Sequence, residues 1–162
     1  MNSSLDKILI IDFGSQVTQL IARQIRELGV YCELINYKNF NSKKFSFSDI
    51  KGIILSGGPK STLTKAAPSI DLNIDFKKIP VLGICYGHQL ISNFFGGKTN
   101  YSKKKEFGSA VLYEKKNSIL TKNFFKKKKN ILCKRLSYSV KIKQKNFSII
   151  ASTSNSKCTV LE

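Results

Sequence analysis

The sequence has little that would place it in a membrane, in a disulfide-stapled scaffold or around a metal ion. No apolar run among its 162 residues approaches the about 18 residues that a membrane span needs. Its four cysteines form no Cys-x-x-Cys pair, and its polar start leads directly into a strand pattern. We therefore expect no signal peptide, reduced thiols, no metal site and a cytoplasmic protein.

Acidic residues are also scarce, with 10 against 28 basic residues and a net charge of +18. Residues 1–100 have 12 basic and 7 acidic side chains, whereas residues 101–162 have 16 and 3. Such a balance is typical of nucleic-acid-binding proteins, whose affinity falls steeply with salt. Here the excess is scattered lysine, and the run Lys126–Lys129 lacks regular aromatic interleaving for stacking bases. We expect a solvated surface and keep nucleic-acid binding as an alternative.

The first hundred residues alternate short apolar runs with helical patterns. Strands are predicted at residues 7–12, 30–35, 52–55 and 79–84, helices at residues 17–28 and 89–95, and weaker helical segments within residues 36–51 and 60–78. This order predicts an α/β fold with an open, mostly parallel sheet flanked by helices. Three loops, residues 13–16, 56–59 and 83–88, would then meet at the carboxyl ends of the strands, where ligands bind.

The pattern changes after Gly97. Short strands are predicted at residues 111–113, 130–133, 139–143 and 147–151, and they indicate a small antiparallel C-terminal part. The given sequence stops at Glu162, within what reads as a further strand. We therefore expect a single domain over residues 1–162 that is incomplete at its C-terminus, with a sheet edge left uncovered.

The strongest local signal is Gly-Ile-Cys-Tyr-Gly at residues 83–87, between the last of the four strands and a helix. A nucleophile between two glycines in a sharp strand-to-helix turn is typical of a nucleophile elbow, here with a thiol at Cys85. Gly83 and Gly87 would be needed because the chain comes too close to itself for Cβ atoms. The helix N-terminus would lower the thiol pKa and favour the thiolate. A buried structural cysteine is the alternative.

A second glycine pair, Gly57 and Gly58, follows the third predicted strand. Neighbouring glycine N–H groups can point inward, and together with the N–H after Cys85 they could form an oxyanion hole for a tetrahedral intermediate. An ordinary Gly-Gly turn is the alternative. The stretch is not a phosphate loop, because it lacks the spacing and the lysine of Gly-x-x-x-x-Gly-Lys-Ser/Thr.

Three stretches together resemble the glutamine amidotransferase domain of GMP synthetases, which is a class I glutamine amidotransferase with a flavodoxin-like fold. These are Asp-Phe-Gly-Ser-Gln at residues 12–16 with its continuation to residue 33, Ser-Gly-Gly-Pro at 56–59, and Gly-Ile-Cys-Tyr-Gly-His-Gln at 83–89. Glu-Phe-Gly at 106–108 is a further short match. The resemblance is close over residues 7–110 and degenerate over residues 111–162.

The resemblance implies the chemistry of glutamine hydrolysis. Cys85 would attack the side-chain amide of glutamine, Gly58 and Tyr86 would donate backbone N–H groups to the oxyanion, and Gln89 and Gly57 would help to hold the substrate. The released ammonia would pass to a separate synthetase chain, which uses ATP and Mg²⁺ to aminate XMP to GMP. No cofactor is implied for this chain itself.

One part of the family's catalytic machinery is missing from the sequence. The family supplies its base in a His-Pro-Glu motif, whereas the only histidine here is His88, three residues after Cys85. A cysteine nucleophile of this kind needs a group that takes its proton and returns it to the leaving ammonia. The ring of His88 is expected to point along the helix and not across the sulfur. A non-catalytic pseudo-amidotransferase subunit, which binds or regulates a synthetase partner, is therefore the alternative function.

Overall fold

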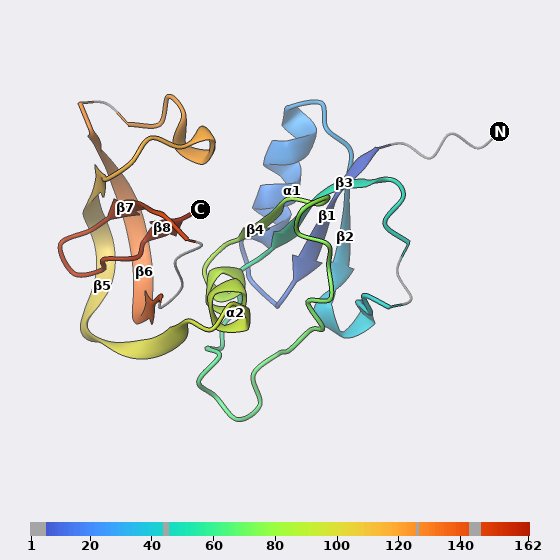
Figure 1. The fold of residues 1–162 in the computed structure, drawn as a ribbon, viewed down its shortest axis with the longest axis horizontal. Helices are drawn as coiled ribbons and strands as arrows, with labels where there is room; N and C mark the ends of the chain where they lie inside the picture. The colour runs from blue at the N-terminus through green and yellow to red at the C-terminus, as the bar shows by residue number, and fades with distance from the viewer. Residues whose placement is uncertain (1–5, 44–45, 126, 143–146) are drawn as a thin grey trace. The chain divides into compact units, whose positions relative to one another are not determined.

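The computed structural model describes residues 6–43, 46–125, 127–142 and 147–162 of the chain (Figure 1). It contains two compact units, residues 1–91 and residues 92–162, and each is described by itself. No helix within the described ranges is long and apolar enough to cross a membrane. The polar start before Asp6, Lys126 of the lysine run and Lys143 of a predicted strand lie outside the described residues.

The first unit is built on a four-stranded parallel sheet with strand order β2-β1-β3-β4. Its elements are β1 (Lys7–Asp12), α1 (Thr18–Glu27), β2 (Cys32–Asn36), the 3₁₀ turn η1 (Tyr37–Asn39), β3 (Ile50–Leu55), β4 (Val81–Gly83) and most of α2 (Tyr86–Phe94), whose last three residues fall in the second unit. The predicted α/β class and parallel sheet are confirmed, although only two α-helices are present in the described residues.

Side chains of the central strands point alternately into two apolar layers, as expected for strands buried on both faces. On one face, Ile10 and Cys32 pack with Ala22 of α1. On the other face, Leu9 and Ile11 of β1 and Ile53 and Leu55 of β3 pack with residues from the chain between β3 and α2 and with Tyr86. The helix α1 and the β3–α2 segment therefore cover opposite faces of the sheet.

Three predicted elements of this unit differ in the structure. The helical segment predicted within residues 36–51 is only the 3₁₀ turn η1 in the described residues. The predicted strand at residues 79–84 is shortened to β4, because Pro80 before it has no N–H to donate to a neighbouring strand and the turn into α2 begins after Gly83. Residues 60–78 form no helix, because the side chains of Ser61, Asp71 and Asp75 accept from backbone N–H groups two residues ahead and stabilise turns instead.

The second unit is a four-stranded antiparallel sheet with strand order β6-β5-β7-β8. It comprises β5 (Lys98–Glu114), the 3₁₀ turn η2 (Ile119–Thr121), β6 (Lys129–Lys141), β7 (Ile149–Ser152) and β8 (Val160–Leu161). The predicted antiparallel part is thus confirmed, but two predicted strands merge into β6. Apolar runs in the sequence underestimate the length of such strands, because their exposed positions carry charge. Lys98 and Lys141, which are paired in the register, are examples. The single-domain prediction stays a prediction.

Candidate active site

Cys85 lies in a sharp turn between β4 and α2, at the carboxyl end of the parallel sheet. Its φ of 54° falls in the left-handed region, which is strained for a residue with a side chain. A Cβ added to Gly83 would come within 2.6 Å of the Gly87 carbonyl carbon, and one added to Gly87 would overlap the Leu55 carbonyl oxygen. The predicted elbow geometry is confirmed, and both glycines are required by close backbone approach.

The backbone N–H groups of Gly58 and Tyr86 favour the thiolate of Cys85 and act to lower the pKa of its thiol. These are the two groups that the resemblance assigned to the oxyanion. The Cys85 side chain keeps a solvent-exposed surface, yet the surrounding protein removes enough water to disfavour the thiolate. Burial therefore raises the pKa of the Cys85 thiol above its ordinary value, and the two N–H groups only partly oppose it. The expectation of a lowered thiol pKa is wrong, because desolvation outweighs these N–H groups.

The glycine pair after β3 packs directly against the elbow. A Cβ added to Gly57 would lie 3.5 Å from the Cβ of Cys85 and 3.3 Å from the Ser15 hydroxyl oxygen. A Cβ added to Gly58 would lie 2.9 Å from the Phe13 carbonyl oxygen. The three loops that the sequence predicted to meet are thus brought together around Cys85.

Polar side chains that sequence reasoning did not select hold these loops together. Asp12 Oδ1 accepts from the backbone N–H groups of Gly14 (2.9 Å) and Ser15 (3.3 Å) and from the Thr18 hydroxyl (2.8 Å). The Thr18 hydroxyl also lies 3.1 Å from the hydroxyl oxygen of Ser56, the first residue after β3. The available signal was the position of Asp12 and Ser56 at the carboxyl ends of adjacent strands.

Gln89 lies one turn after Cys85 on α2, where its backbone N–H donates to the Cys85 carbonyl at 3.2 Å. Its side chain is buried, and Oε1 accepts from the Ser61 hydroxyl and from the backbone N–H and hydroxyl of Thr62, each at 3.2 Å. The side chain therefore anchors the segment that follows Pro59. A role for Gln89 and Gly57 in holding glutamine stays a prediction.

His88, the only histidine of the sequence, has a buried Nε2 with no hydrogen-bond partner among the described residues. Burial lowers the pKa of its imidazole, because the charged form is disfavoured away from water. His88 thus forms no Nε2 hydrogen bond to Cys85 and is kept neutral. The structure gives no support to His88 as the base.

Tyr86, the first residue of α2, fixes the start of this helix through its buried side chain. Its fully buried ring packs against Phe13, with ring centroids 5.1 Å apart, and its hydroxyl donates to the Pro68 carbonyl oxygen. Burial, together with the nearby Tyr37, raises the pKa of Tyr86 to about 12, so the phenol remains a donor. The buried Tyr86 side chain thus holds the backbone whose N–H favours the Cys85 thiolate.

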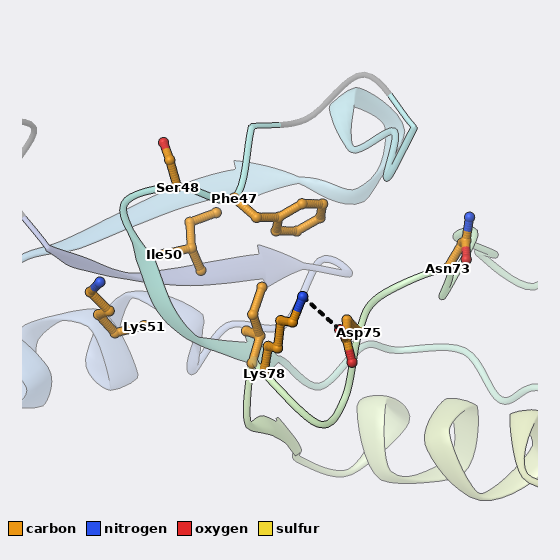
Figure 2. A pocket seen from close by; sticks show the side chains of 8 residues that line it. Phe47, Ser48, Ile50, Lys51, Asn73, Asp75 and Lys78 are labelled. Atoms are coloured by element: carbon orange, nitrogen blue, oxygen red, sulfur yellow. Dashed lines mark ion pairs between the residues drawn. The ribbon is translucent and has the colours of Figure 1, made fainter.

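A pocket of about 580 Å³ lies at the opposite, amino end of β3 (Figure 2). It is lined by Phe47, Ser48, Ile50, Lys51, Asn73, Asp75, Lys78 and Ile79, and Lys78 pairs with Asp75 at 3.6 Å. None of the predicted site residues lines it. Among the described residues, no three His, Cys, Asp or Glu side chains gather in a way that could hold a metal ion.

Comparison with known sequences identifies a family. The model of the class I glutamine amidotransferase family matches residues 9–162. A glutamine-hydrolysing GMP synthase of Xylella fastidiosa is 51% identical over 105 residues, which are 65% of this chain and 20% of that protein. The corresponding protein of Ruthia magnifica is 43% identical over 157 residues, which are 95% of this chain and 30% of that protein. The chain thus spans less than a third of the length of these relatives.

Comparison with solved structures supports the fold. A Thermoplasma acidophilum protein assigned to GMP synthase as one of its subunits superposes with a TM-score of 0.78 over 99% of this chain and 79% of that one, at 21% identity. A glutamine amidotransferase of Methylobacillus flagellatus gives a TM-score of 0.72 over 98% and 66%, at 15% identity. At these identities the likeness shows the fold alone.

Proposed function

Since the chain belongs to the class I glutamine amidotransferases, we propose that it is the glutamine-binding component of a GMP synthetase and that Cys85 is its nucleophile. The observation that carries this proposal is the left-handed elbow at Cys85 with the glycine pair packed against it, where the Gly58 and Tyr86 N–H groups favour the thiolate. An oxygen that becomes negative on a carbon bonded to this sulfur would form beside both donors. Such preorganised donors are a large part of acyl-transfer catalysis.

The reaction follows from this placement. The Cys85 thiolate attacks the carboxamide carbon of glutamine, and the carbonyl oxygen becomes an oxyanion that accepts from Gly58 and Tyr86. The C–N bond then breaks, ammonia leaves with an added proton, and a thioester remains. Water hydrolyses the thioester to glutamate and returns the thiol.

The step needs one group that removes the thiol proton as a base and then delivers it to the leaving ammonia as an acid, and this sequence does not visibly supply it. The raised pKa of the Cys85 thiol makes the need greater, and His88, whose Nε2 is buried, is kept neutral. General acid–base catalysis contributes about 10²–10⁴-fold in rate, so turnover by the chain alone should be slow. This observation favours a second candidate function, a non-catalytic subunit that binds glutamine and regulates a synthetase.

In either case the partner is an ATP-dependent synthetase chain. We propose that ATP and Mg²⁺ bind to that chain, which uses the ammonia to aminate XMP to GMP in purine biosynthesis. The similarity to the glutamine-hydrolysing GMP synthases of Xylella fastidiosa and Ruthia magnifica supports this assignment. We propose the cytoplasm as its location, because the described thiols of Cys32, Cys85 and Cys158 are free and cytosolic conditions keep thiols reduced.

Glutamine hydrolysis by the purified chain tests the proposal. Glutamate and ammonia are measured for the chain alone and with the synthetase chain of the same organism, with Cys85→Ala as the control. Turnover that vanishes in Cys85→Ala supports a catalytic subunit. Glutamine binding that survives Cys85→Ala, without turnover in the wild type, supports the non-catalytic subunit, and no glutamine binding at all contradicts both.

A further inference from the structure

The Gly58 N–H, which favours the Cys85 thiolate, belongs to the peptide group between Gly57 and Gly58, and this glycine pair packs against the elbow, with a Cβ added to Gly57 only 3.5 Å from the Cys85 Cβ. A peptide group is planar and trans, so its carbonyl oxygen and its N–H point in opposite directions. Fixing the Gly57 carbonyl therefore fixes the direction of the Gly58 N–H. Because both residues are glycines, backbone sterics leave this plane freer to rotate than in other residues, and something else must hold it.

The Ser56 hydroxyl restrains this peptide plane. It is fully buried and donates to the Gly57 carbonyl oxygen at 3.0 Å. The hydroxyl oxygen of Ser56 accepts from the Phe13 N–H at 3.3 Å and lies 3.1 Å from the Thr18 hydroxyl. Thr18 is in turn held by Asp12 Oδ1 at 2.8 Å and is itself buried. Ser56 is thus placed from one side by the β1–α1 loop and acts on the glycine pair from the other.

The backbone of Ser56 also contacts both neighbouring elements. Its N–H donates to the Ile11 carbonyl at 3.0 Å, and its carbonyl accepts from the Gly87 N–H at 3.0 Å. The backbone of Ser56 is therefore fixed to β1 and to the elbow, and the Gly57–Gly58 peptide is the next peptide group that can rotate. The hydrogen bond from the Ser56 hydroxyl to the Gly57 carbonyl restrains that rotation.

We propose that Ser56, supported by Thr18 and Asp12, is a positioning residue that clamps the Gly57–Gly58 peptide so that the Gly58 N–H faces the Cys85 sulfur before glutamine binds. This inference rests on the proposed function, because it assigns the Gly58 N–H to the oxyanion. Ser56 acts on neither the sulfur nor the substrate amide directly. Its effect passes through one peptide plane.

The test measures the Cys85 thiol itself and needs no glutamine. The rate of carboxamidomethylation by iodoacetamide is followed from pH 6 to 10 by mass spectrometry of the peptide that contains Cys85. In Ser56→Ala the Gly58 N–H is freed from the sulfur, and the thiol pKa rises by about half a unit to one unit. The rate at neutral pH then falls about 3- to 10-fold.

Three further variants separate positioning from loosening of the fold. Thr18→Val keeps the shape but removes the hydroxyl and should shift the profile in the same direction, while Thr18→Ser restores the hydroxyl and the wild-type profile. Ser42→Ala removes another buried hydroxyl of this unit, whose partner is Asp71 at 2.9 Å, and should leave the profile unchanged. Thr18→Val also decides the question if Ser56→Ala does not fold.

The outcomes are distinct. A shift in Ser56→Ala and Thr18→Val that is absent in Ser42→Ala supports the clamp. A wild-type profile in Ser56→Ala, or an equal shift in Ser42→Ala, overturns it. Where the chain hydrolyses glutamine with its partner, Ser56→Ala should lower kcat and leave KM nearly unchanged, and unchanged kcat contradicts the clamp. A chain that binds no glutamine but shows the alkylation shift would retain the clamp and contradict the proposed function.

Discussion

The two ends of the parallel sheet are held together by different interactions. At the carboxyl end, the loops after β1, β3 and β4 meet through backbone contacts and buried hydroxyls, as in Ser56 and Thr18. At the amino end, Lys7 of β1 lies between Glu33 of β2 and Asp49 before β3, at 2.8 and 2.9 Å. The first end has little space for any added atom, and the second has an open pocket beside β3.

This difference indicates what each end contributes. Directed N–H groups need fixed peptide planes, which short hydrogen bonds and close backbone packing provide. Ion pairs between long side chains hold strands in register but tolerate movement, and they are weakened by salt. We therefore expect substitutions at the carboxyl end to be severe and specific, and those at the amino end to be milder and dependent on solution conditions.

The addition of one methyl group tests the difference between the two ends of the sheet most directly. Gly87→Ala places a Cβ against the Leu55 backbone, 2.5 Å from the Leu55 Cβ, and no side-chain rotation relieves the overlap. We expect a loss of at least about 3 kcal/mol in the free energy of unfolding, measured by urea denaturation.

Gly52→Ala is the matched substitution near the amino end of the same sheet. Its Cβ meets the terminal Cδ1 of Ile8 at 3.1 Å, which a side-chain rotation can relieve, and the Pro80 carbonyl oxygen only at 3.6 Å. We expect a cost of about 1 kcal/mol or less. Equal losses in Gly87→Ala and Gly52→Ala would contradict the distinction between a closed and an adaptable end.

Lys7→Met tests the ion pairs of the amino end. It removes the cation between Glu33 and Asp49 and keeps the apolar length of the side chain, so the free energy of unfolding should fall by less than in Gly87→Ala. The difference between Lys7→Met and wild type should shrink in 1 M NaCl, where the Debye length is about 3 Å. A difference that is independent of salt would mean that packing of the lysine stem, and not charge, is what Lys7 contributes.

The same pairs give the amino end a dependence on pH. The hydrogen bond from Lys7 holds the pKa of Asp49 below its ordinary 3.8. The folded state therefore binds this proton less readily than the unfolded state, and the stabilisation is present above the unfolded value and lost as pH falls through the folded one. The pKa of Lys7 is raised above 10.5, chiefly by its hydrogen bond to Glu33, so its contribution is complete below that pH and is lost in stronger alkali.

Thermal unfolding of wild type and Lys7→Met at several pH values measures this contribution. The stability difference should be constant between about pH 5 and 9, and it should shrink below about pH 4. A difference that grows on acidification would contradict the Lys7–Asp49 pair.

The two ends also differ in how far the sequence predicted them. Asp12 ends β1 as expected, and the elbow at Gly83–Gly87 followed from two glycines and the apolar run before them. These features are local, so spacing along the chain determines them. The roles of Ser56 and Thr18 depend on contacts across 38 residues, which no periodicity records. Likewise, Lys7, Glu33 and Asp49 look like ordinary charged residues until β1, β2 and β3 are adjacent.

The pKa of the Cys85 thiol is a second property that the sequence alone could not predict. A helix N-terminus after Cys85 is readable from the sequence, and the Tyr86 N–H at the start of α2 favours the thiolate as expected. How much water the folded chain removes from Cys85 is not readable, because it depends on every element packed around the elbow. The sign of the shift therefore came out opposite to the prediction.

The smallest effect that we expect tests whether the backbone of Cys85, at the carboxyl end of the sheet, is held in a strained conformation for the chemistry. The left-handed φ of Cys85 costs about 1–2 kcal/mol for a residue with a Cβ, whereas glycine adopts it freely. Because glycine also raises the entropy of the unfolded chain, Cys85→Gly should exceed Cys85→Ala by only about 0.5–1 kcal/mol in the free energy of unfolding. Both variants lack the sulfur, so the difference reports the backbone alone and is measured by urea denaturation side by side. If Cys85→Ala were the more stable of the two, the elbow would be relaxed, and the left-handed turn would be a consequence of packing at Gly83 and Gly87 and not a strain held in place for the nucleophile.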